Sequence, residues 1–342
     1  MFEYANKKID LQPQPLAGSV EELLKGSSVE NEIDAADSRS GAVLERVTID
    51  GNRYVLKRIS WSRDWLMRTS GDKNGWTVRA WESGIMSHIP SSIDHTTVGA
   101  ARWESQRGVE SAVLMRDIGD CVVADGDSAI PIKQHLQFID RMALLHATFL
   151  GVEEVSGLMP LANRYLFLSP EVARREFEYD ASNEIPKFIL SGWEKLSESA
   201  PELAAVVRPI HDDISPFLNA VRKTPLTFMH GDWKATNLGT GRDGRTILLD
   251  WAFPGFGPGC SELVWYLAIN SARNPQSREE TIEAYRTALE HHGVDTADWW
   301  ERQIGLAMIG VMVQFGWEKA LGSGDELEWW VSHTPSLASL NE

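Results

Sequence analysis

Residues 230–237 read His-Gly-Asp-Trp-Lys-Ala-Thr-Asn, and residues 248–251 read Leu-Leu-Asp-Trp. These segments place Asp232, the amide of Asn237 and a second carboxylate at Asp250 within one short part of the chain. The residues between them are rich in turn formers, include Asp243-Gly244 and are followed by an apolar run, which predicts a β-hairpin. Because the open ends of a hairpin lie together, we expect Asn237 and Asp250 to be close enough to share a cation.

This set of side chains is typical of phosphoryl transfer from a magnesium-bound nucleotide. That reaction needs a carboxylate to orient the attacking hydroxyl and oxygen ligands for metal ions that bridge the phosphates. Asp232 lies on the loop before the hairpin and is the candidate for the first role, while Asn237 and Asp250 are candidates for the second. The alternative is that these residues only form a turn and end a strand. The spacing favours a small-molecule kinase.

A lysine upstream fits the same chemistry. Residues 43–49 and 53–59 are predicted strands joined by a turn at residues 50–52. On the second strand Lys57 shares a face with apolar residues such as Ile59, where an ammonium is costly unless an anion meets it. Nucleotide phosphates would supply that anion. The alternative is a solvated lysine at a sheet edge.

A carboxylate is expected to position the Lys57 ammonium. Glu82 is the candidate, because it lies in the helical-looking stretch over residues 78–88. Glu45 and Glu104 also lie in this region of the sequence.

These motifs resemble the aminoglycoside phosphotransferase and choline kinase-like group, which shares the two-lobed protein-kinase fold. The matching pieces run over about residues 40–270. The resemblance implies that Asp232 is the catalytic residue, that Asn237 and Asp250 hold Mg²⁺, and that Lys57 contacts the α- and β-phosphates. It also places Lys234 where protein kinases have a lysine that approaches the γ-phosphate.

Two further segments carry the resemblance. Residues 113–118 resemble the strand and hinge that hold adenine through backbone groups, which makes Met115, Asp117 and Ile118 candidate nucleotide contacts. The segment Leu-Leu-His-Ala at residues 144–147 resembles the long helix that supports the catalytic loop.

The chain also departs from the group. No Gly-x-Gly-x-x-Gly segment precedes Lys57, so Ser38-Arg39-Ser40-Gly41 is expected to serve as the phosphate turn, with Ser40 and Gly41 as its contacts. Glu262 stands where the group usually has an aspartate, and we expect it to brace the loop. The stretch between Lys57 and Glu82 is longer than the resemblance requires and is rich in tryptophan.

Periodicity predicts a strand-rich front and a helical back, which alone indicates an α+β protein. With the resemblance, we expect a lead-in over residues 1–37, with a short helix near residues 20–24, a nucleotide-binding N-lobe over 38–118 and a helical C-lobe over 119–342. Pro209 and Pro216 are expected to kink or break their helix. The predicted helices of the C-lobe are 132–149, 184–197, 202–221, 281–291 and 299–320.

Bulk properties agree with a cytoplasmic enzyme. The 342 residues are 43% apolar and 24% charged, and two cysteines provide no disulfide framework. The polar start has no apolar core of a signal peptide. The apolar stretch over residues 304–315 is too short to span a membrane and is predicted to be a buried helix.

The net charge of −16 argues against nucleic acid as a partner. An acidic surface favours a small hydroxylated acceptor that is cationic, such as an amine or aminosugar. The sequence leaves open ATP or GTP, a monomer or homodimer, and the identity of the acceptor. Three other functions stay open: a protein kinase, a nucleotide-binding pseudokinase, and a metal-dependent hydrolase that uses His230, Asp232 and Asp250.

Overall fold

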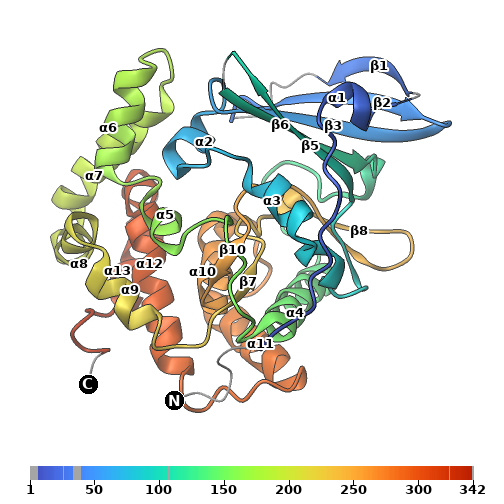
Figure 1. Cartoon of the computed structure of the whole chain (residues 1–342). Helices are drawn as coiled ribbons and strands as arrows, with labels where there is room; N and C mark the ends of the chain where they lie inside the picture. Colours follow the sequence, from blue (N-terminus) through green and yellow to red (C-terminus); the bar gives the residue numbers. More distant parts are fainter. Residues whose placement is uncertain (1–6, 26, 34–39, 107, 323, 341–342) are drawn as a thin grey trace.

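The computed structural model describes residues 7–25, 27–33, 40–106, 108–322 and 324–340. A twisted β-sheet forms one lobe, and a larger assembly of helices forms the other (Figure 1). This two-lobed α+β arrangement confirms the fold class expected from the sequence.

The N-lobe contains a five-stranded antiparallel sheet with the strand order β1-β2-β3-β6-β5. Its strands are β1 (Ser27–Ile33), β2 (Val43–Ile49), β3 (Asn52–Ser60), β5 (Thr97–Ser105) and β6 (Gly108–Arg116). The predicted hairpin of β2 and β3 is confirmed, with Lys57 opposite Leu44 and Val113. Strand β1 lies within the expected lead-in, so the sheet begins before residue 38.

Successive side chains of a strand point to opposite faces of the sheet. Helices pack against both faces of this sheet. On one face Leu56 packs with Val20 of α1 (Val20–Leu23), the predicted short helix. On the other face Ile59 packs with Met67 of α2 (Trp65–Ser70) and with Val78 of α3 (Trp76–Ser83). Lys57 is two residues from Ile59, so it shares the face that carries α2 and α3.

The helix predicted over residues 78–88 is shorter than expected. Helix α3 ends at Ser83 because Gly84 has φ 80°, a left-handed conformation that stops a helix. The 3₁₀ helix η2 (Ile85–His88) and strand β4 (Ile93–Asp94) follow.

The C-lobe packs around one large apolar core. Its helices are α4 (Ile132–Phe149), α5 (Leu161–Leu166), α6 (Pro170–Tyr179), α7 (Ile185–Ser199), α8 (Pro201–Asp212), α9 (Ser215–Val221), α10 (Gly259–Ile269), α11 (Arg278–His291), α12 (Trp300–Leu321) and α13 (Gly324–His333), with the 3₁₀ helices η3 (Gly119–Cys121) and η5 (Ser271–Arg273). The five predicted helices are present. The expected break after residue 202 falls between α8 and α9, with Pro209 still inside α8.

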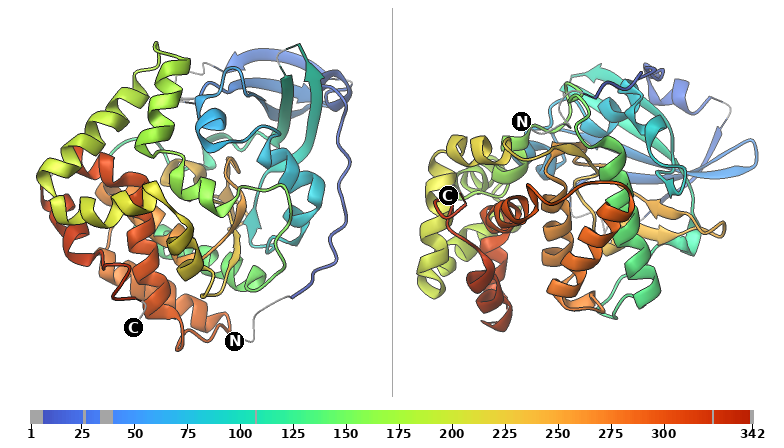
Figure 2. Two further views of the ribbon diagram at one scale, coloured as in Figure 1. Left: turned by 60° about the vertical axis from the view of Figure 1, so that its left-hand side comes forward. Right: turned by 90° about the horizontal axis from the view of Figure 1, so that it is seen from below.

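Helix α12 runs through the middle of this core and contacts α7 and α10 (Figure 2). By length and apolar content it is the one helix of the described residues that could cross a bilayer. Most of its side chains are buried, including Ile309, Met312 and Val313, as in the core helix of a globular protein. This confirms the buried helix expected over residues 304–315.

Two short sheets lie between the lobes. Strand β7 (Thr227–Met229) pairs with β10 (Gly255–Gly257), and β8 (Leu238–Thr240) pairs with β9 (Thr246–Leu248). Strand β4 adds to β9 in parallel. The antiparallel pair β8–β9 is the hairpin predicted from the Asp-Gly turn.

The N-terminal segment links the two lobes along one side of the molecule (Figure 2). The backbone N–H of Lys7 donates to Gly151 O at 2.8 Å in the C-lobe. Further along, Gln14 N donates to Glu82 O at 3.0 Å, and Ala17 N donates to Ala100 O of β5 at 3.0 Å. We call residues 7–17 the N-terminal strap.

The close contact of α7 with α12 depends on a glycine. A Cβ on Gly192 would lie 2.4 Å from the backbone oxygen of Trp317, so the Gly192→Ala variant must push the two helices apart. We expect it to lower the free energy of unfolding by about 1–3 kcal/mol, measured by urea titration. Gly324→Ala is the matched control because a Cβ there meets open space. Equal stability of the two variants would contradict this packing.

Candidate active site

The β8–β9 hairpin brings Asn237 and Asp250 together. Asn237 ends the 3₁₀ helix η4 (Ala235–Asn237), just before β8, and Asp250 follows β9 by two residues. The backbone N–H of Leu249 donates to Asn237 O at 2.8 Å, which closes the hairpin at its open end. The predicted proximity of Asn237 and Asp250 follows from this pairing.

Asp250 forms an ion pair with Lys57 across the two lobes. The ammonium Nζ of Lys57 lies 2.6 Å from Asp250 Oδ1. Burial alone would raise the pKa of Asp250, but the charges of Lys57 and Lys234 outweigh it and lower the pKa to about 2. The carboxylate is therefore ionised at neutral pH. Asp250 also has φ 56°, a strained conformation that its surroundings must hold in place.

Asp232 lies beside Asn237 on the preceding loop. Its carboxylate oxygen Oδ2 accepts a hydrogen bond from Asn237 Nδ2 at 2.9 Å and is 2.8 Å from Lys234 Nζ. Asn237 Nδ2 also donates to Asp232 O at 3.0 Å. The amide nitrogen of Asn237 is directed at Asp232. The side-chain oxygen of Asn237 is therefore the atom that can coordinate a metal ion.

His230 fixes the loop that carries Asp232. Its Nε2 donates to Leu249 O at 2.7 Å, and its Nδ1 accepts the backbone N–H of Asp232 at 3.2 Å. Burial lowers the pKa of His230, so the ring is neutral with its proton on Nε2. His230 therefore braces the segment that carries Asp232. It ties the residue before Asp250 to Asp232 through one ring.

A buried carboxylate on α10 holds the same loop from below. Glu262 accepts backbone N–H groups from His230, at 3.3 Å, and from Gly231, and its Oε2 is 2.9 Å from His146 Nε2 on α4. Burial opposes ionisation, but the His146 hydrogen bond and the nearby donors together lower the pKa of Glu262. Glu262 therefore has the bracing role expected of it, and His146 shows how α4 supports the loop.

Sequence reasoning missed Arg164 on α5. This buried guanidinium donates from Nη2 to Phe253 O at 2.7 Å, and a Cβ on Gly231 would lie 2.7 Å from its Nη1. Arg164 therefore joins the loop before Asp232 to the segment after Asp250. A single arginine in a short amphipathic stretch gives no signal of this role in the sequence.

The expected phosphate turn is described in part. Ser38 and Arg39 lie outside the described residues. Ser40 O accepts the backbone N–H of Trp65 at 3.1 Å. Gly41 has φ 97°, and a Cβ there would lie 2.4 Å from Arg63 O. The turn thus contacts the start of α2, which packs on the sheet face that carries Lys57.

The N-cap of α2 is a buried acid that the sequence did not single out. Asp64 accepts the backbone N–H groups of Leu66, at 2.9 Å, and Met67, at 3.1 Å. Burial raises the pKa of Asp64, and the charge of Lys57 opposes that rise. Asp64 therefore lies in the electrostatic environment of Lys57.

The hinge residues connect β6 to the C-lobe. Met115 is in β6, opposite Val55, and Asp117 N donates to Arg53 O at 3.1 Å. Ile118 precedes η3, after which Val123 N donates to Leu238 O of β8 at 2.7 Å. The connection between the lobes therefore runs along the β8–β9 hairpin.

The expectation that Glu82 positions Lys57 is wrong. Glu82 is near the end of α3 and pairs with Arg79 at 3.2 Å and with Arg102 of β5 at 3.4 Å. The guanidiniums of Arg79 and Arg102 pair with the Glu82 carboxylate, whereas Lys57 forms its ion pair with Asp250. On α3, Thr77 instead donates to Trp251 O at 2.6 Å, one residue after Asp250.

The structure resembles solved kinases over almost its whole length. Choline kinase LicA from Streptococcus pneumoniae matches with a TM-score of 0.50 and 12% identity, covering 94% of this chain and 96% of that chain. The chain has a protein-kinase-like fold.

Two other solved structures are similar. A microcompartment-associated aminopropanol kinase has a TM-score of 0.48 and 11% identity, covering 90% of this chain and 89% of that chain. Aminoglycoside phosphotransferase APH(4)-Ia has a TM-score of 0.47 and 12% identity, covering 94% of this chain and 95% of that chain. No family model and no curated protein matches the sequence.

The Glu262 brace can be tested through stability. In the Glu262→Gln variant one acceptor oxygen becomes an amide that cannot accept the backbone N–H groups of the loop. We expect the free energy of unfolding to fall by about 1–3 kcal/mol, measured by urea titration. Glu283→Gln, on the exposed side of α11, is the control. If both variants unfold at the same urea concentration, Glu262 does not hold the loop.

Proposed function

We propose that this protein is a phosphotransferase that moves the γ-phosphoryl group of Mg-bound ATP, or GTP, to a hydroxyl of a small molecule. The carrying observation is the convergence of Asp232, Asn237 and Asp250 with Lys57 from the other lobe. A cation and several oxygen ligands at one point between the lobes suit a substrate that is itself a metal-bound polyanion. The protein-kinase-like fold is consistent with this chemistry.

The donor set fits Mg²⁺. Asp250 offers an ionised carboxylate and Asn237 an amide oxygen, which are hard ligands of the kind this ion prefers. Within the described residues no cluster of three or more His, Cys, Asp or Glu side chains forms a metal cage. Mg²⁺ in kinases is held by few protein ligands together with substrate phosphates, so this sparse set suits it. Bound there, the ion would neutralise charge on the phosphates.

Asp232 would orient the acceptor. Its carboxylate accepts a hydrogen bond from the substrate hydroxyl and aligns that oxygen with the γ-phosphorus. The bond between the γ-phosphorus and its bridging oxygen breaks as the bond to the acceptor oxygen forms, and the hydroxyl proton passes to Asp232 and then to solvent. Lys234 and Lys57 stabilise the negative charge. Positioning and charge stabilisation carry most of the rate acceleration in such a reaction.

The other predicted nucleotide contacts would hold the base and cover the phosphates. The backbone from Met115 through Asp117 to Ile118 would hold the base, and the turn at Ser40 and Gly41 would cover the phosphates. All of these residues border the face of the sheet that carries Lys57 or its connection to the C-lobe.

A small acceptor is favoured over a protein substrate. The segment after Asp250 contains no Ser, Thr or Tyr before α10 begins at Gly259, and residues 253–260 are buried. Such a segment has no room for a phosphorylation-controlled loop or a ledge for a peptide. The complete set of Lys57, Asp232, Asn237 and Asp250 also favours an active enzyme over a pseudokinase.

Asp232→Asn tests the catalytic assignment. The amide cannot accept the hydroxyl proton, so we expect turnover to fall by roughly two to four orders of magnitude. Nucleotide affinity should change little. ADP release in the presence of pooled hydroxylated compounds, with mass detection of the product, measures turnover, and calorimetry measures affinity. Asp212→Asn, at the exposed end of α8, is the control. Full turnover by Asp232→Asn would refute the assignment.

Asp250→Asn tests the metal assignment separately. The wild type should bind the nucleotide more tightly with Mg²⁺ than with EDTA, whereas the variant should lose most of that difference because it lacks the ionised ligand. Calorimetric titration of ADP under both conditions measures this, with Asp243→Asn at the exposed tip of the hairpin as control. An unchanged Mg²⁺ dependence in Asp250→Asn would exclude this carboxylate as a metal ligand.

A further inference from the structure

A cavity of about 500 Å³ lies between α2 of the N-lobe and helices α5 and α6 of the C-lobe. Its volume is in the range of small-molecule sites in proteins. Most of its wall is apolar or aromatic, formed by Trp61, Leu166, Phe167, Val172 and Tyr179. We call it the α2–α6 cavity. The long tryptophan-rich stretch noted in the sequence supplies one side of it.

The elements that line the α2–α6 cavity contact two segments next to the proposed reaction centre. Phe167 in its wall packs against Phe253, with ring centroids 5.4 Å apart, three residues after Asp250. Helix α2, which lines the cavity through Arg68 and Thr69, begins where Trp65 N donates to Ser40 O of the expected phosphate turn. The walls of the cavity are therefore continuous with the segment after Asp250 and with the turn expected to cover the phosphates.

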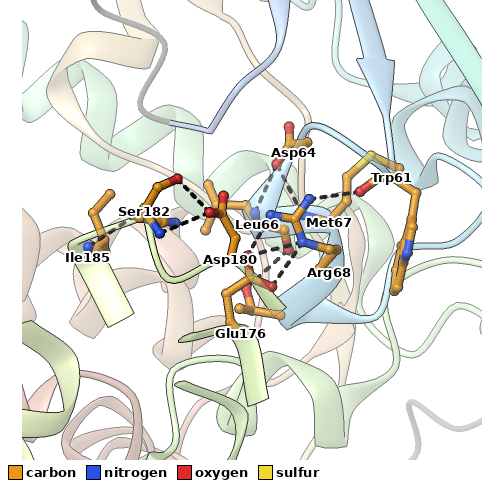
Figure 3. Close-up of polar contacts among 11 residues, drawn as sticks. Trp61, Asp64, Leu66, Met67, Arg68, Glu176, Asp180, Ser182 and Ile185 are labelled. Atoms are coloured by element: carbon orange, nitrogen blue, oxygen red, sulfur yellow. Dashed lines mark hydrogen bonds and ion pairs between the residues drawn. The ribbon is translucent and has the colours of Figure 1, made fainter. Parts of the chain in front are cut away.

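The carboxylate in the cavity wall is already neutralised. Glu176 on α6 accepts two hydrogen bonds from Arg68 Nε, at 2.9 and 3.1 Å, and a third from Nη2 at 2.5 Å (Figure 3). Arg68 Nη1 donates to Trp61 O at 3.1 Å. Both side chains of this pair are buried. Among the described residues that line the cavity, Glu176 is the one acid, while Arg175 adds a second guanidinium.

The aromatic faces beside the cavity are also occupied by protein cations. The Arg68 guanidinium lies 4.6 Å from the centroid of the Tyr179 ring, and Lys73 Nζ lies 6.0 Å from that of Trp61. Quaternary ammonium ligands bind through such faces, so these two are poorly placed to receive one. A cationic acceptor would lose its water and meet guanidiniums without a matching carboxylate.

We propose that the α2–α6 cavity is the acceptor pocket and that it selects a neutral, largely apolar alcohol over an amine or aminosugar. This rests on the proposed phosphotransferase function and reverses the expectation of a cationic acceptor drawn from the net charge. The chain as a whole is acidic, but the two arginines and one glutamate that line this cavity give it a net positive charge. Local charge governs which molecule can be desolvated there.

Matched pairs of acceptors that differ by one charge provide the test. The first pair is choline and its neutral carbon isostere dimethylbutanol, and the second is phenyl glucosaminide and phenyl glucoside. We expect kcat/KM for the neutral member to exceed that for the charged member by about tenfold or more, since an unpaired charge is costly to bury. ADP release and product mass measure turnover. A preference for the charged members would overturn the proposal.

Variants of the cavity wall locate the selectivity. Trp61→Ala should raise KM for the neutral acceptors about tenfold, since a large apolar contact is lost, whereas Phe188→Ala on the exposed face of α7 should not. Arg68→Met frees the Glu176 carboxylate and should shift selectivity towards the charged member of each pair. The double variant Arg68→Met/Glu176→Met removes both charges and leaves no unpaired buried charge that would oppose folding. It should keep the preference for the neutral member of each acceptor pair. Unchanged KM and selectivity in all of these variants would place the acceptor elsewhere.

If none of the four acceptors is phosphorylated, their binding to the protein tests the proposal instead. Thermal shift of the Asp232→Asn variant with MgADP is then measured with each member of the two pairs. Larger stabilisation by the neutral members supports the proposal, and larger stabilisation by the charged members, or none by either, refutes it. Failure of the nucleotide itself to bind would refute the phosphotransferase function as well, which separates the two outcomes.

Discussion

The contact between Lys57 and Asp250 sets the geometry on which the rest of this site depends. Lys57 is fixed by its register in the sheet, and Asp250 by the β8–β9 hairpin, so the two charges meet only when the lobes are correctly placed. Around this pair each polar group has a neighbour that limits its freedom. His230 links Asp232 to the residue before Asp250, and Glu262 holds the loop from below. Preorganised charges of this kind are what electrostatic catalysis requires.

The stretch between Lys57 and α3 adds a further contact between the lobes. Arg68 of α2 reaches Glu176 of α6, and Asn163 of α5 donates to Ser70 O at 2.8 Å. The hinge and these contacts both connect the lobes. Since Arg68, Glu176 and Asn163 also line the α2–α6 cavity, the contact between the lobes determines the shape of that cavity.

The site was more predictable from the sequence than its surroundings. Asn237 and Asp250 were placed together by a local rule, the Asp-Gly hairpin, and the bracing role of Glu262 was expected from the resemblance. Glu82 was assigned wrongly because Arg79 and Arg102 compete for its carboxylate, and β5 is remote from it in sequence. The contacts of Arg164 and the pairing of Arg68 with Glu176 could not be predicted, since no periodicity records a contact between distant segments. Strand β1 was missed for the same reason: only its pairing with β2 defines it. The N-cap Asp64, by contrast, is a local signal that was overlooked.

The N-terminal strap has a consequence for the order in which the molecule assembles. Lys7 precedes both lobes in the chain, yet its ammonium donates to Thr148 O, 141 residues further along. Its attachment points in the C-lobe and on β5 must exist before it can dock, and bringing such distant segments together costs chain entropy. During translation the strap is therefore made before the segments that it contacts, and it reaches its native position only after the chain has been extended at least to Gly151 and β5 has formed.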